Sequence, residues 1–155
     1  MMEHAVSLGS KSVTFPALCV PRDSGVYLVR DLPELRRSRA QLYWRYHHFE
    51  GLRIYDCEER AFEVTAASVS RPVSTLGRLS ARLLDLTITV DVEISPIGSA
   101  SLSEVISAVQ RAIDADPESF EELSERSIEW WQETLAHTSS VQGVIRAFGD
   151  PQNDG

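Results

Sequence analysis

Residues 41–51, QLYWRYHHFEG, gather more residue types capable of chemistry than any other short stretch of the chain. They include the adjacent histidines His47 and His48, and Asp56 and Cys57 follow a few residues later. Imidazole, carboxylate and thiolate groups bind metal ions and serve as acids, bases or nucleophiles in catalysis. One hypothesis for the function is therefore a small enzyme that uses these four residues.

The spacing of these residues argues against a metal site. Side chains of adjacent residues point to opposite faces of a strand and diverge by about 100° on a helix, so neighbouring histidines rarely bind one ion. A zinc site needs three or four protein ligands, and the other cysteine, Cys19, lies far upstream. We therefore predict no metal-binding residues.

The surroundings of Asp56 and Cys57 also argue against catalysis. Cys57 lies in the acidic stretch YDCEER, where neighbouring carboxylates raise the pKa of a thiol and oppose thiolate formation. Asp56 precedes a tight turn, a position typical of an aspartate that caps its own backbone. The chain contains no GxSxG, GxGxxG, Walker or HExxH motif. We predict no catalytic residues and no cofactor, and interpret the protein as non-enzymatic.

Arginines and aromatic residues are interleaved between positions 36 and 53, a composition typical of surfaces that bind single-stranded nucleic acid. The residues are Arg36, Arg37, Arg39, Arg45 and Arg53, with Tyr43, Trp44 and Tyr46 among them. The isoelectric point near 5.0 opposes an RNA-binding module on this Arg36–Arg53 surface. The other interpretation is a solvated basic helix face that pairs with the acidic second half of the same molecule.

The charge of the chain is divided unevenly, and this asymmetry is the clearest indication of function in the sequence. Residues 1–82 hold 12 basic and 9 acidic side chains, whereas residues 83–155 hold 3 basic and 14 acidic ones. The formal net charge of the whole chain is −8. An acidic half repels nucleic acid and attracts basic partners.

The acidic residues are densest in one segment that we expect to form a helix from Asp116 to about 135. Its glutamates are Glu118, Glu121, Glu122, Glu125, Glu129 and Glu133. Four of them follow the 3.6-residue spacing of one helix face, although like charges four residues apart cost a few tenths of a kcal/mol per pair. Trp130 and Trp131 are adjacent, so we expect one in the core and the other exposed as an interface anchor.

These observations predict a small non-enzymatic protein that binds another protein, a basic one, through its acidic C-terminal face. The predicted partner-binding residues are those six glutamates and Trp130. One concrete version is an immunity- or antitoxin-like inhibitor that covers a cationic toxin, an analogy from size and charge. The small enzyme and the RNA-binding module are the two alternatives.

Length and composition bound the architecture. A chain of 155 residues favours one domain, which we place at 1–150 with a frayed tail at 151–155. No run of about 18 apolar residues predicts a membrane span, and the first ten residues lack the pattern of a signal peptide. Two cysteines without CxxC spacing predict free thiols, so we expect a cytoplasmic protein.

In the first two thirds of the chain, the pattern predicts mainly strands. Pro16 and Pro21 bracket an expected loop, 26–29 reads as a short strand, and Asp31 caps a helix that runs to about 40. A hairpin is expected at 52–56 and 61–66, followed by a connection at 67–80. Residues 84–94 alternate between apolar and polar side chains, which indicates a strand with one face in water, ending at 95–98.

The last third predicts helices at about 101–113, 116–135 and 139–149. Their expected buried residues include Leu123, and Gly149 is expected to end the last helix in the left-handed conformation. Together the elements predict an α+β fold: a three- or four-stranded antiparallel sheet, one early helix, and a helical C-terminal third packed on one face.

Overall fold

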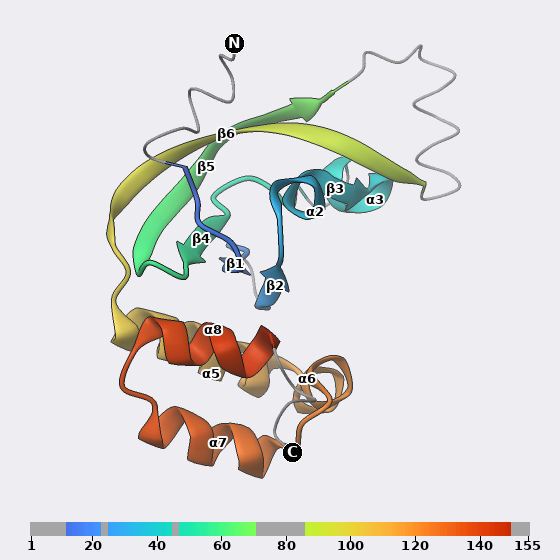
Figure 1. Cartoon of the computed structure of the whole chain (residues 1–155). Helices are drawn as coiled ribbons and strands as arrows, with labels where there is room; N and C mark the ends of the chain where they lie inside the picture. Colours follow the sequence, from blue (N-terminus) through green and yellow to red (C-terminus); the bar gives the residue numbers. More distant parts are fainter. Residues whose placement is uncertain (1–11, 23–24, 45–46, 71–85, 150–155) are drawn as a thin grey trace.

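The computed structural model describes residues 12–22, 25–44, 47–70 and 86–149, and its fold is α+β (Figure 1). Six antiparallel strands form one curled sheet in the order β2-β1-β4-β5-β6-β3. The strands are β1 (Ala17–Val20), β2 (Tyr27–Val29), β3 (Arg37–Arg39), β4 (Arg53–Asp56), β5 (Arg60–Val69) and β6 (Thr87–Ser99). The antiparallel α+β class is confirmed, but the expected three or four strands are too few.

Six helices are described. They are α2 (Leu32–Arg36), α3 (Ala40–Trp44), α5 (Leu102–Ala115), α6 (Pro117–Ser124), α7 (Ile128–His137) and α8 (Val141–Gly149). None of the helices in the described residues is long and apolar enough to cross a membrane.

The long strands β5 and β6 form a curved ribbon that arches over α2, β3 and α3 (Figure 1). In β6, one set of alternating side chains packs into a core: Ile88, Val90, Val92 and Ile94. The side chains between them are exposed: Thr87, Thr89, Asp91 and Glu93. The alternation therefore predicted correctly that one face of this strand is exposed to solvent. The predicted end at 95–98 is wrong, because β6 pairs with β5 as far as Ser99. Pro96 lacks a backbone N–H donor. It is tolerated within β6 because this half of the strand pairs with only one strand, β5, among the described residues.

Strand β1 was missed in the sequence, where its flanking prolines suggested a loop. The strand pairs with β2 on one side and β4 on the other, and Ala17, Leu18 and Cys19 have no exposed surface. A strand buried on both faces shows no apolar–polar alternation, and four residues are too few for any other periodic signal. The prolines therefore mark the ends of a strand.

The expected helix from 31 to about 40 is interrupted. Asp31 caps α2 as predicted, accepting a hydrogen bond from the Glu34 amide at 2.8 Å, but the chain becomes extended at Arg37. The Arg36 guanidinium donates to the Val90 carbonyl at 3.0 Å and pairs with Asp91, which holds the next three residues beside β6 as β3. These contacts with a distant strand override the local helix propensity.

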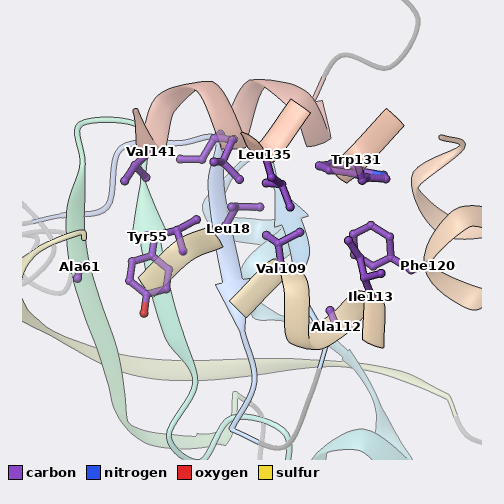
Figure 2. Close-up of a cluster of buried hydrophobic side chains, with 13 residues drawn as sticks. Leu18, Tyr55, Ala61, Val109, Ala112, Ile113, Phe120, Trp131, Leu135 and Val141 are labelled. Atoms are coloured by element: carbon purple, nitrogen blue, oxygen red, sulfur yellow. The ribbon is translucent and has the colours of Figure 1, made fainter. Parts of the chain in front are cut away.

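Two hydrophobic cores lie on opposite faces of the sheet. Helices α5 to α8 cover one face, where Leu18 and Tyr55 of the sheet meet the helical side chains (Figure 2). On the other face α2 and the loop at Phe49 cover Cys19 and Ile54. The helical C-terminal third therefore packs on one face as predicted, whereas the early helix α2 packs on the opposite face. The expectation of one exposed sheet face came from the alternating pattern of β6 alone. The shorter central strands β1 and β4 instead have a hydrophobic core on each face.

The turn between β4 and β5 is organised by Asp56, a carboxylate with no exposed surface. Its Oδ1 accepts hydrogen bonds from the amides of Glu58 and Arg60 at 3.1 and 2.9 Å, as expected for a backbone cap. Its Oδ2 accepts from the Thr14 amide at 3.0 Å and from the Arg60 guanidinium. Arg60 also donates to the Ser12 carbonyl at 2.8 Å, so one ion pair ties the N-terminal segment to the hairpin.

We predict that Asp56→Ala lowers the free energy of unfolding by about 3–5 kcal/mol, because it leaves the Arg60 cation and three hydrogen-bond donors without their acceptor. Chemical denaturation at neutral pH measures the change. Glu58→Ala is the matched control, since the Glu58 carboxylate is exposed, and should cost less than about 1 kcal/mol. Equal losses in both variants would contradict a structural role for Asp56.

Candidate protein-binding surface

The acidic segment forms two helices rather than the single helix expected. Helix α6 ends at Ser124, and Glu125 adopts the left-handed conformation with φ of 60°. Helix α7 begins after Ser127, whose hydroxyl accepts a hydrogen bond from the Trp130 amide at 3.1 Å. Two serines in the segment were the sequence signal for this break, because serine favours caps over helix interiors. The predicted stripe of four glutamates on one helix face is therefore wrong.

Five of the six predicted glutamates are nonetheless exposed, and we call them the acidic surface: Glu118, Glu122, Glu125, Glu129 and Glu133. The sixth, Glu121, has a structural role. Its carboxylate accepts a hydrogen bond from the Ile128 amide at 2.7 Å, which satisfies a free donor at the start of α7. Within the described part of the chain, none of these five carboxylates forms an ion pair shorter than 4 Å.

Leu123 is 81% exposed, although the sequence predicted that it is buried. The prediction assumed that the helix continues and keeps its apolar stripe against the core. Because α6 ends one residue later and the chain turns at Glu125, Leu123 stays outside the core and lies next in sequence to Glu122. A large apolar side chain among carboxylates has the composition of an interface anchor.

The two tryptophans divide as expected between core and surface. Trp131 is fully buried, donates to the Ser124 hydroxyl at 2.9 Å and packs on Phe148 with ring centres 4.6 Å apart. Trp130 is half-buried, and the Arg126 guanidinium lies 4.5 Å from its ring centre. Trp130 also lines a shallow groove of about 440 Å³ along α7, with Glu133, Thr134 and His137. Trp130 is therefore the tryptophan available to a partner.

The residues of the enzyme hypothesis do not converge. His48 Nε2 lies 2.7 Å from the Tyr27 hydroxyl, whereas His47 is exposed and pairs with Glu50 at 3.0 Å. In the sheet, Asp56 pairs with Ala17 at one end of β1, while Tyr27 pairs with Cys19 two residues along. Within the described ranges no three histidine, cysteine, aspartate or glutamate side chains are placed to hold a metal ion.

Burial raises the pKa values of the two cysteine thiols. Both cysteines are free, as predicted. Burial raises the pKa of Cys19 to about 12. Burial also raises the pKa of Cys57, with further contributions from Asp56 and Glu58, and its Sγ donates to the Thr14 carbonyl at 3.4 Å. The predicted direction for Cys57 is confirmed, and an elevated pKa disfavours a thiolate nucleophile.

The arginines of the RNA hypothesis point to different neighbours. Arg36 is engaged with β6, and Arg53 lies between Glu63 at 3.6 Å and Glu104 at 3.8 Å. Arg37 is exposed on β3, and Tyr43 meets Trp44 edge to face with ring centres 5.3 Å apart. Arg45 and Tyr46 lie outside the described residues. Arg36 pairs with Asp91 and Arg53 with Glu104, carboxylates of the acidic half, as the second interpretation expected. Arg37 and Arg53 lie on strands, however, so the expected basic helix face does not form.

Comparison of the chain with models of known protein families, with curated proteins and with solved structures found no match. Any function assigned to the acidic surface therefore depends on its own geometry and charge.

We predict that His48→Phe weakens the dependence of stability on pH. Burial lowers the pKa of His48 below its ordinary 6.5, so the unfolded chain binds the proton more readily. The buried, neutral imidazole of His48 therefore contributes to stability fully above about pH 6.5. That contribution is lost as the pH falls toward the pKa of His48 in the folded state, because protonation then favours the unfolded chain. Denaturation at pH 7.5 and pH 5.0 measures the difference, which should be smaller in His48→Phe than in the wild type.

His137→Gln is the control for this measurement, because it removes a histidine from the exposed end of α7. It should follow the wild-type pH dependence. The same dependence in His48→Phe and wild type would show that protonation of His48 does not oppose folding.

Proposed function

We propose that this protein is a non-enzymatic module that binds a basic partner protein through the acidic surface on α6 and α7. The observation that carries the proposal is the exposure of five glutamates on two consecutive helices and the turn between them, beside an exposed leucine. Glutamates held by internal ion pairs would already be neutralised. Among the described residues these five form no such pair, so we take their charge to be available to a partner.

The local charge supports a cationic partner. Between Asp116 and Glu133 the chain has seven acidic side chains and one basic one, Arg126. The Arg126 guanidinium lies over the Trp130 ring. A field of one sign raises the rate of encounter with a partner of opposite charge and disfavours partners of like charge.

Apolar contacts would supply the affinity that exposed charges lack. Leu123 projects from α6, and Trp130 lines the groove of about 440 Å³ on α7. Interfaces concentrate their binding energy in a few aromatic and apolar anchors, and the charges around them exclude poor partners. We therefore assign Leu123 and Trp130 as anchors and the glutamates as the selective rim.

An inhibitor that covers a cationic toxin, in the manner of immunity proteins and antitoxins, is the concrete form of the proposal. It combines a small acidic chain, a rigid helical surface and an electrostatically steered encounter. A cytoplasmic location belongs to the same proposal, because both cysteines are free thiols, as in reducing compartments.

The decisive test compares capture of partners from an extract of the native source by the wild type and by the triple variant Glu122→Lys, Glu125→Lys and Glu129→Lys. We expect the wild type to retain a basic protein that salt displaces, and the triple variant to lose it. The purified partner is then titrated against both proteins. Because the three side chains are exposed, circular dichroism should show an unchanged fold.

The matched control reverses three exposed glutamates elsewhere, Glu50→Lys, Glu58→Lys and Glu93→Lys, with the same change in net charge. It should keep the partner with little loss of affinity. Retention of the same partner by the α6–α7 variant, or equal loss in both triple variants, would refute binding through the acidic surface.

Leu123→Ser tests the apolar half of the surface separately. Truncation of an interface anchor typically costs about 2 kcal/mol or more, so the affinity for the captured partner should fall about thirtyfold. The stability of the free protein should change little, because the side chain is 81% exposed. An unchanged affinity would remove Leu123 from the interface.

A further inference from the structure

Two adjoining grooves lie away from the acidic surface. One, of about 650 Å³, is lined by the loop at 47–51 and by β5, and the other, of about 620 Å³, lies between β4 and α5. Both are lined by Arg22, Gly51 and Glu63, so they meet at these three residues. Gly51 has φ of 71°, and a side chain there would lie against the Arg22 stem at 3.5 Å.

The groove beside α5 has the character of an anion site. Three arginines line it, of which Arg53 is held by Glu63 and Glu104. Arg22 and Arg111 form no ion pair or hydrogen bond with the described residues. Arg22 and Arg111 thus bring two guanidinium groups to one groove, and a guanidinium group can donate paired hydrogen bonds to a phosphate or a carboxylate.

Helix α5 adds to the same site. Its residues Ser103, Ser107 and Arg111 are spaced four apart, so they share one helix face, and all three line the groove. Ser103 lies in the first turn of a helix that begins at Leu102, where the helix dipole is positive. In a chain of net charge −8, this groove has three arginines and two glutamates in its lining. The local charge is thus opposite in sign to that of the whole protein.

The other groove offers aromatic rings. Tyr43, Trp44 and Phe49 line it, and Tyr43 and Trp44 meet edge to face with ring centres 5.3 Å apart. Its two carboxylates already have cationic or imidazole partners: Glu50 lies 3.0 Å from His47, and Glu63 lies 3.6 Å from Arg53. An aromatic wall beside paired charges suits a planar ring, which gains stacking and apolar contact.

We infer that the two grooves form one binding site for a small ligand that carries a planar ring at one end and an anionic group at the other. The ring lies beside Tyr43 and Trp44, and the anion lies between Arg22 and Arg111. A nucleoside monophosphate and an aromatic carboxylate share this chemistry. The site is independent of partner binding on α6 and α7.

Isothermal titration of the full chain with defined probes tests the site. The probes are AMP, UMP, indole-3-carboxylate, adenosine and inorganic phosphate. We expect at least one of the ring-bearing anions to bind with a Kd of about 1 mM or lower, and adenosine and phosphate to bind at least about tenfold more weakly. Binding of the nucleotides alone identifies a phosphate ligand, and binding of indole-3-carboxylate alone identifies a carboxylate ligand.

Variants then locate the bound probe. Arg22→Ala and Arg111→Ala should each weaken binding about tenfold or more, because each removes a charge-assisted contact. Arg146→Ala, an exposed arginine on α8, is the matched control and should leave binding unchanged. Trp44→Leu should weaken the ring-bearing probes, and circular dichroism checks its fold.

Three results would overturn the inference. They are no binding of any ring-bearing anion at concentrations up to about 10 mM, equal affinity for AMP and inorganic phosphate, and wild-type affinity in both Arg22→Ala and Arg111→Ala.

Discussion

The burial of β1 on both faces is the constraint on which the rest of the structure depends. Leu18 belongs to the core under the C-terminal helices, while Ala17 and Cys19 belong to the core on the opposite face. The backbone of β1 is paired on both sides, with β2 and β4. Four residues thereby join two hydrophobic cores and the sheet between them.

Each candidate functional surface depends on one side of this arrangement. The core around Trp131 fixes α6 and α7, and the hydrogen bond between the Trp131 indole and Ser124 holds the junction of these helices. That junction exposes Leu123 and the glutamates. On the other face, the core around Phe49 and Leu52 supports the loop that lines the aromatic groove. Rigid supports of this kind reduce the entropy that a partner or ligand must remove on binding.

The elements with long, regular patterns could be predicted from the sequence. The alternation in residues 84–94 predicted the buried face of β6, and the helix predicted at about 101–113 is α5. The capping role of Asp56 also followed from its position before a turn. These features depend on local sequence, where periodicity and turn chemistry determine the structure.

The remaining elements depend on contacts between distant residues. Strand β3 exists because Arg36 reaches Val90 and Asp91, more than fifty positions away. The break between α6 and α7 depends on Glu121, which bonds the amide of Ile128, and this moved Leu123 from the core to the surface. The arginine groove unites Arg22 and Arg111 across the sheet and α5, so no spacing in the sequence could indicate it.

Deuterium exchange on the complex with the captured partner tests the central claim most directly, because it maps the contact without altering a residue. Binding through the acidic surface predicts that the partner slows amide exchange in α6 and α7, from Pro117 to His137, and leaves the β5–β6 ribbon unchanged. Protection confined to the sheet or to the groove between β4 and α5, with α6 and α7 exchanging as in the free protein, would contradict it.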